Sequence, residues 1–185
     1  MRHENVLDPE RAVLLIVDLQ DGFRNVIHEF SEIVARAAIV TEAAKLLGLP
    51  ILANEQYPQK LGATVEEIRR ALPASVTPVE KTSFSSCEAD GFWPALESTG
   101  RRQVMLVGIE AHVCMNQTAH DLLARGYQVH LLTDCTSSRT PANRELGISK
   151  MGRSGALPSS SEMALFELMR DSKHEHFKAI SKLIK

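Results

Sequence analysis

The sequence predicts an α/β protein, a doubly wound, Rossmann-like three-layer sandwich around a parallel sheet of five or six strands. Short apolar runs typical of strands alternate along the chain with longer amphipathic segments. Two of those runs, Ala12–Val17 and Gln103–Ile109, are apolar at nearly every position, as is usual for strands covered on both faces. Because strand–helix–strand units place successive strands parallel in one sheet, the alternation favours helices on both sides of it.

In the first part of the chain, three expected strands are separated by two expected helices. The first helix runs over Phe30–Leu47 and ends before Gly48, a common helix stop. The second covers residues 64–72, with Thr64 as its cap and Glu67 three residues later. The strands are Ala12–Val17, Pro50–Asn54 and Val76–Lys81.

A loop carrying three aromatic residues leads into the second part of the chain, where strands and helices continue to alternate. The expected strands are Gln103–Ile109, Gln128–Asp134 and a short one around Ala156–Leu157. The expected helices are Val113–Arg125, Pro141–Met151 and Glu162–Arg170. The C-terminal sequence FKAISKLIK is amphipathic and is expected to dock on the surface. Since no repeat or linker divides the chain, we expect residues 1–185 to form a single domain.

The composition excludes several classes of function. The 185 residues hold 21 Lys and Arg against 23 Asp and Glu, a net charge of -2. No block of like charge is present to contact a nucleic acid or a membrane surface. The apolar runs are too short to span a membrane, and the polar N-terminal sequence does not resemble a signal peptide. We therefore expect a cytoplasmic protein with a small-molecule partner, and its three cysteines as free thiols.

Three chemically reactive side chains follow predicted strands. Asp18 comes directly after the first strand, Lys81 ends the third, and Cys114 lies at the start of the helix after the fourth. Open parallel sheets bind ligands at the carboxyl ends of their strands, so these residues are expected to converge. Each also has an ordinary structural explanation, because Asp18 could be a turn residue, Lys81 a solvated lysine and Cys114 a packing residue.

Together the three side chains suit acyl-transfer chemistry. A lysine ammonium and a helix N-terminus both lower the pKa of a nearby thiol, which favours the nucleophilic thiolate. The Asp18 carboxylate can accept the thiol proton and hold Lys81. Backbone N–H groups in the turn between Gly108 and Cys114 could bind the oxyanion of a tetrahedral intermediate. We therefore expect hydrolysis of an amide or similar carbonyl through an acyl-enzyme.

Four stretches carry a resemblance to a known family: VDLQDGF, VEKTSFS, the block from Gly108 to Arg139, and MGRSGALPSSSEMAL. Over nearly the whole chain the sequence resembles the isochorismatase-like cysteine hydrolase superfamily, and within it the isochorismatase-domain-containing branch. The resemblance implies a catalytic triad of Asp18, Lys81 and Cys114. It also implies a cis peptide between Ile109 and Glu110, with the N–H groups of Glu110 and Cys114 forming the oxyanion hole.

Departures from the family patterns narrow the substrate and the cofactors. Nicotinamidases of the superfamily carry an Asp-x-His metal motif after the second strand, where this chain has Asn54-Glu55-Gln56-Tyr57. We therefore expect no metal, and the absence of G-x-G-x-x-G and P-loop motifs indicates no nucleotide cofactor. Isochorismatases proper hydrolyse a vinyl ether, which needs no thiol, so the presence of Cys114 favours acyl chemistry.

Four residues are candidates for binding substrate. Phe23 and Tyr57 could wall a small planar substrate, although both could be ordinary core aromatics. Ile109 adjoins the predicted oxyanion turn. Arg139 occupies a position at which amidases of the superfamily bind a substrate carboxylate, with a surface salt bridge as the alternative. Relatives commonly assemble, so a homo-oligomer, either a dimer or a tetramer, is expected.

The leading hypothesis is a cysteine hydrolase of a small amide, carbamoyl or ester-like substrate. Isochorismatase-type vinyl-ether hydrolysis is the first alternative. A non-catalytic binding protein that retains the fold is the second, and a redox role for Cys114 is the third. Cys87 and Cys135 are interpreted as packing residues.

Overall fold

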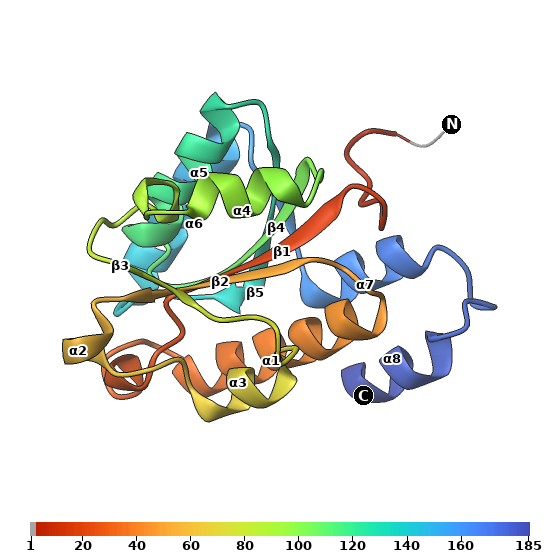
Figure 1. The fold of residues 1–185 in the computed structure, drawn as a ribbon, viewed down its shortest axis with the longest axis horizontal. Coiled ribbons are helices and arrows are strands. Elements are labelled where there is room, and N and C mark those ends of the chain that lie inside the picture. The colour runs from red at the N-terminus through yellow and green to blue at the C-terminus, as the bar shows by residue number, and fades with distance from the viewer. Residues whose placement is uncertain (1–2) are drawn as a thin grey trace.

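The structure, a computed structural model that describes residues 3–185, is built around a parallel sheet of six strands (Figure 1). Their order across the sheet is β3-β2-β1-β4-β5-β6, so the chain starts near the middle and winds outward in both directions. This confirms the predicted doubly wound α/β fold. The strands are β1 (Ala12–Val17), β2 (Ile51–Gln56), β3 (Val79–Lys81), β4 (Gln103–Gly108), β5 (Gln128–Thr136) and β6 (Leu157–Ser159).

Helices cover both faces of the sheet, which makes three layers (Figure 1). One face carries α1 (Phe30–Leu46), α3 (Glu66–Ala71), α7 (Ser161–Met169) and α8 (Phe177–Ile184). The other face carries α4 (Phe92–Ser98), α5 (Cys114–Ala124) and α6 (Pro141–Arg153). The short helix α2 (Pro58–Leu61) and two 3₁₀ turns, Asp21–Phe23 and Ser86–Glu88, complete the elements. No helix in the described part of the chain is both long and apolar enough to cross a membrane.

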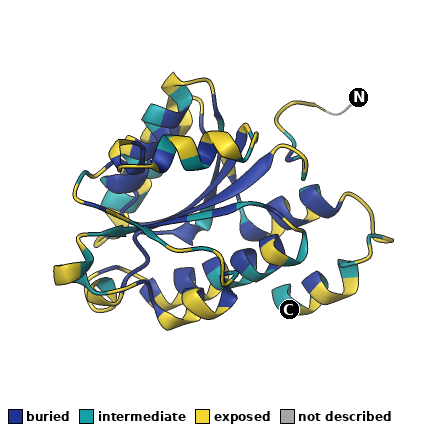
Figure 2. Cartoon of the chain, viewed as in Figure 1, coloured by how far each residue is buried: buried dark blue, intermediate teal, exposed yellow. Residues whose placement is uncertain are grey.

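The two helical layers produce two hydrophobic cores, one on each side of the sheet. All six residues of β1 are buried, and Figure 2 shows the strands as the buried centre of the molecule. Leu14 and Ile16 contribute to the core under α1, whereas Val13 and Leu15 contribute to the core under α5. Side chains alternate between the faces of a strand, so a strand covered on both faces is apolar throughout.

The ends of β1 and β4 approach each other closely at Gly108. Gly108 pairs with Val17 and has a φ of 128°, a conformation that favours glycine. A Cβ atom added there would lie 2.0 Å from the carbonyl oxygen of Val17. That oxygen accepts a hydrogen bond from the N–H of Ile109 at 3.0 Å, so the backbone cannot move aside without losing it.

Gly108→Ala should therefore destabilise the protein by about 2–4 kcal/mol, because the new methyl group meets backbone and the positive φ is strained. Urea unfolding measures the change. Gly152→Ala is the matched control, since an added Cβ at Gly152 meets nothing within 4 Å. Alanine is the better helix former by about 1 kcal/mol, so the control should be neutral or stabilising. Equal effects of the two substitutions would contradict the close-approach explanation.

Several expected boundaries differ from the structure. The loop expected before β4 contains α4, a helix of only seven residues that has Pro94 in its first turn, where proline is tolerated. The expected Thr64 cap is wrong, because Val65 precedes α3 and Thr64 instead donates its hydroxyl and its N–H to Glu55. A serine caps α7, since the Ser160 hydroxyl accepts from the N–H of Met163.

The C-terminal amphipathic segment forms α8. It packs beside α1 and α7 through its fully buried Ile180. The expectation that this segment docks on the surface is thereby confirmed.

Candidate active site

Asp18 stands at the carboxyl end of β1, where the chain leaves the sheet. Its φ is 55°, in the left-handed region that aspartate enters more readily than most residues. Only 1% of the residue is exposed. Its Oδ2 atom accepts a hydrogen bond from Lys81, whereas Oδ1 has no hydrogen-bond partner among the described residues. A buried carboxylate is thus held by one charged partner and keeps one oxygen for other use.

Lys81, the last residue of β3, extends its side chain across the end of β2 to reach Asp18. Its Nζ lies 2.8 Å from Asp18 Oδ2, and the side chains of both residues are almost completely buried. Nζ also donates to Gln56 Oε1 at 2.6 Å and to the carbonyl oxygen of Phe84 at 3.1 Å. The ammonium is therefore surrounded by oxygen atoms, which compensates for the loss of water around a buried charge.

Gln56 is a member of this cluster that the sequence analysis did not identify. Its side chain accepts from Lys81 and donates to the carbonyl oxygen of Thr82 at 2.8 Å. Its backbone is held in turn by the side-chain amide of Gln20. The one sequence signal for this role of Gln56 is that a polar residue stands at the end of β2, in the stretch that lacks the nicotinamidase metal motif.

Cys114 is the first residue of α5, and 7% of it is exposed. Its thiol lies beside the Asp18 carboxylate, so that each group shifts the pKa of the other. Burial raises the pKa of Asp18, while Lys81 and the thiol oppose the rise. The three residues predicted at the strand ends therefore form one contiguous cluster.

The expected direction of the thiol pKa is wrong. The sequence predicted a lowered value, but burial raises the pKa of Cys114 to about 12, and the negative charge of Asp18 adds to the rise. Lys81 and the N–H of Glu110 oppose it without overcoming it. The resting thiol is consequently protonated, and it becomes a nucleophile only if its proton is removed during attack. The carboxylate beside the thiol is that of Asp18.

The turn that leads into α5 presents backbone donors near the sulfur. The peptide between Ile109 and Glu110 is cis, as the resemblance implied. The N–H of Glu110 is directed at the Cys114 sulfur and lowers the pKa of the thiol. Cys114 is the first residue of a helix, so its backbone N–H has no carbonyl within the helix to which it can donate a hydrogen bond. These two N–H groups are the pair predicted for an oxyanion hole.

The predicted aromatic wall is divided in the structure. Phe23 is half-buried and packs against the core under α1, and Ile109 is fully buried in that same core. Tyr57 is 42% exposed and lines a cavity of about 380 Å³ beside Lys81. The cavity is bordered by Gln59, Glu80, Thr82, Ser83, Glu88 and Asp90, and it meets the triad only through Lys81.

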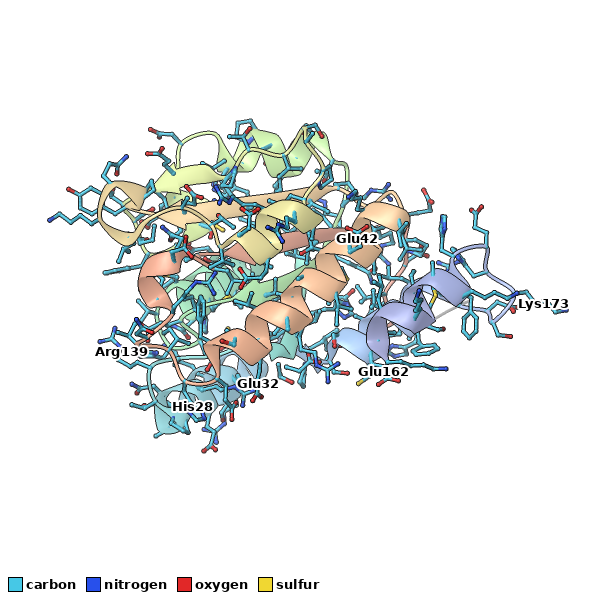
Figure 3. The ribbon with its side chains drawn as sticks, turned by 90° about the horizontal axis from the view of Figure 1, so that it is seen from below. His28, Glu32, Glu42, Arg139, Glu162 and Lys173 are labelled. Atoms are coloured by element: carbon cyan, nitrogen blue, oxygen red, sulfur yellow. The ribbon has the colours of Figure 1, made fainter. Side chains whose placement is uncertain are left out.

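Arg139 is engaged by the protein itself. Its Nε and Nη2 atoms donate to the two carboxylate oxygens of Glu110 at 3.0 and 2.6 Å. Its guanidinium side chain is 62% exposed, whereas that of Glu110 is 7% exposed. Figure 3 shows Arg139 at the same end of the molecule as His28 and Glu32. Arg139 therefore forms a salt bridge, which was the alternative to substrate binding, and its partner is the buried carboxylate of Glu110.

Among residues 3–185, no three His, Cys, Asp or Glu side chains gather closely enough to hold a metal ion. All three cysteines are free and buried. Burial raises the pKa of Cys87 to about 12 and that of Cys135 well above its ordinary value.

The comparisons with known proteins agree with this fold. Residues 12–163 match the model of the Isochorismatase domain. The chain is 43% identical over 182 residues to mouse isochorismatase domain-containing protein 2A, covering 96% of this chain and 84% of that protein. It is 39% identical over 179 residues to Atlantic salmon (Salmo salar) isochorismatase domain-containing protein 1, covering 97% of this chain but only 62% of that protein's length.

A solved structure described as a MAR1 ribonuclease from Caenorhabditis elegans has the same fold. Its TM-score is 0.92 at 37% identity, covering 97% of this chain and 92% of that one. The family match, the sequence identity over nearly the full chain and the shared fold lead to one conclusion. This chain belongs to the isochorismatase family and has the fold of its hydrolases.

Proposed function

We propose that the protein is a cysteine hydrolase that cleaves a small amide, carbamoyl or related carbonyl substrate through a thioester intermediate. One observation carries the proposal: a carboxylate, an ammonium and a thiol from three separate segments meet in a buried cluster. The Lys81–Asp18 distance of 2.8 Å and the mutual pKa shifts of Asp18 and Cys114 support it. A buried ion pair is costly to build, so its place beside a thiol is better explained by chemistry than by stability.

The proposed reaction begins with proton transfer. Ionised Asp18 takes the proton of the Cys114 thiol as the sulfur attacks the substrate carbonyl carbon. The carbonyl π electrons move to oxygen, and the resulting oxyanion is held by the N–H groups of Glu110 and Cys114. The intermediate collapses to a thioester, and Asp18 returns the proton to the departing nitrogen.

Hydrolysis of the thioester completes the cycle. Asp18 accepts a proton from a water molecule as the water attacks the thioester carbon. The carbon–sulfur bond breaks, the carboxylic or carbamic acid leaves, and the Cys114 sulfur regains its proton from Asp18. Lys81 keeps the carboxylate ionised between proton transfers, because its charge lowers the pKa of Asp18 against the effect of burial.

An RNA substrate is the alternative that the name of the C. elegans relative raises. RNA binding depends on basic groups that contact phosphates. The cavity beside Lys81 is instead bordered by Glu80, Glu88 and Asp90, and the chain carries a net charge of -2. Carbonyl hydrolysis is therefore the better supported of the two.

A substrate panel tests the proposal. It contains small primary amides, N-carbamoyl acids, isochorismate and a single-stranded RNA oligonucleotide, each incubated with the protein and with Cys114→Ala. We expect turnover of an amide or carbamoyl compound that disappears with the thiol. Isochorismate turnover that survives the substitution would establish the vinyl-ether alternative, and RNA cleavage by both proteins would exclude the cysteine mechanism.

Lys81→Met should move the acid limb of the kcat/KM profile to higher pH. Lys81 lowers the pKa of the buried Asp18, so its removal lets burial raise that pKa further. Asp18 then stays protonated, and unable to accept a proton, up to a higher pH. The profile is measured for the parent, for Lys81→Met and for Lys60→Met, an exposed lysine of α2. An acid limb that does not move in Lys81→Met contradicts the assigned base.

A further inference from the structure

We propose that Arg139 is a positioning residue, which holds the oxyanion turn in place through Glu110 and does not bind the substrate itself. The proposal rests on the proposed function, since it assigns a role in forming the oxyanion hole. The oxyanion turn is here the segment of residues 109–113, between β4 and α5. The holding loop is the segment of residues 137–139, between β5 and α6.

The first step of the argument is the Arg139–Glu110 contact. The Glu110 carboxylate receives three hydrogen bonds from this one residue, two from the guanidinium and one from the backbone N–H at 3.0 Å. Burial acts to raise the pKa of Glu110, but these bonds and the charge of Arg139 hold it below the ordinary value. The contact therefore differs from an exposed ion pair, which contributes little.

The second step is that the other residues of the holding loop bind the same turn. The carbonyl oxygen of Ser137 accepts from the N–H of Ala111 at 2.9 Å. The Ser138 hydroxyl lies 3.0 Å from Nδ1 of His112. With Arg139 on Glu110, three consecutive residues of the loop contact three consecutive residues of the turn. Glu110 is the residue whose N–H is directed at the Cys114 sulfur.

The third step is that the loop and the turn are themselves supported on two sides. The backbone N–H of His28 donates to the Ser138 carbonyl oxygen at 3.0 Å, and the Ser137 hydroxyl donates to the His28 carbonyl oxygen at 2.6 Å. Gly147 of α6 packs so closely that an added Cβ would lie 2.5 Å from the carbonyl oxygen of Ala111. The turn is therefore confined between a polar loop and a helix backbone.

This arrangement disfavours a role as a substrate clamp energetically, because a substrate carboxylate would have to displace the buried carboxylate of Glu110. Glu110 would then be left without its charged partner in a site where only 7% of its side chain is exposed. Leaving a buried charge unpaired is more costly than the gain from one new ion pair. The geometry instead gives Arg139 a use that requires no substrate contact.

A double-mutant cycle tests the proposal. We expect Arg139→Ala to lower kcat by ~10- to 100-fold, because small displacements of catalytic groups have effects of that size. KM should change by less than about threefold, since ground-state binding is not altered. Glu110→Gln should lower kcat too, and the double variant should be no worse than the poorer single one, since both act through one contact. Arg139→Lys should recover part of the loss, and Arg153→Ala, an exposed arginine of α6, should behave like the parent.

A KM increase in Arg139→Ala with kcat unchanged would overturn the proposal and establish a substrate clamp. Additive losses in the double variant would also overturn it. Gly147→Ala provides an independent route, since its added methyl should push on Ala111 and lower kcat, whereas Gly152→Ala on the same helix should not. An unchanged kcat in Gly147→Ala would show that the turn does not need this support.

Amide hydrogen exchange separates the failure of this proposal from that of the proposed function. Exchange at Glu110 and Ala111 should accelerate in Arg139→Ala, whether or not any substrate is turned over. If Cys114→Ala retains activity, the cysteine mechanism fails while the exchange result still decides whether Arg139 holds the turn. Unchanged exchange at both residues overturns the positioning role even in an active cysteine hydrolase.

Discussion

Cys114→Ala is expected to lower kcat for an amide or carbamoyl substrate by at least ~10³-fold, because the reaction loses its nucleophile. Rapid quenching followed by mass spectrometry of the parent should also detect a thioester on Cys114. The acyl group should be absent from the variant. Turnover that continues without the thiol would contradict the covalent route.

Cys87→Ala is the matched control for that experiment. Burial raises the pKa of both Cys87 and Cys114 to about 12, so the two thiols are alike in their readiness to ionise. The Cys87 thiol donates to a backbone carbonyl, that of Thr118 at 3.8 Å, whereas Cys114 lies beside the Asp18 carboxylate. If the neighbouring Asp18 carboxylate, and not the pKa of the thiol, makes Cys114 the nucleophile, the Cys87→Ala variant should keep its activity. Equal losses in the two variants would indicate a structural effect.

Asp18→Asn should have two effects of opposite sign. It should lower kcat by ~10²- to 10⁴-fold, because the general base is removed. It should also lower the pKa of the Cys114 thiol, since the negative charge of Asp18 raises that pKa in the parent. A variant with a more acidic thiol and less activity distinguishes a general base from a group that only stabilises a thiolate.

The alkylation rate of Cys114 against pH measures the second effect, with the modified peptide quantified by mass spectrometry. In Asp18→Asn the rate should rise at a lower pH than in the parent. Asp21→Asn, an exposed aspartate of the following 3₁₀ turn, should leave the profile unchanged. A thiol that titrates at the same pH in all three proteins would falsify the assigned contact between Asp18 and Cys114.

The convergence of Asp18, Lys81 and Cys114 could be predicted from the sequence because it depends on topology. The carboxyl ends of parallel strands share one edge of the sheet, so Asp18 and Lys81 converge although 62 residues lie between them in the chain. Nearly continuous apolar runs identified β1 and β4, whose burial on both faces leaves little ambiguity. The short helices α2 and α4 were not predicted, because so few residues show no helical period and, unlike the segment before α3, their sequences offer no serine or threonine start signal.

The remaining features of the site depend on distances and burial that residue order does not contain. The helix N-terminus and Lys81 predicted a lowered thiol pKa, but the extent of burial around Cys114 determines the sign. The pairing of Arg139 with Glu110 joins two loops that are 29 positions apart. Two expectations remain predictions: that residues 1–185 form a single domain, and that the protein is a homo-oligomer.

The position of Lys81 has a consequence for how activity and folding are related. Lys81 belongs to β3, a three-residue strand at one edge of the sheet that pairs only with β2. Edge segments open in local fluctuations that cost far less free energy than global unfolding. Each such opening would withdraw the ammonium from Asp18 while the central strands remain paired. If Lys81 acts as proposed, the fraction of molecules competent for catalysis would depend on fraying at this sheet edge as well as on the global stability of the fold.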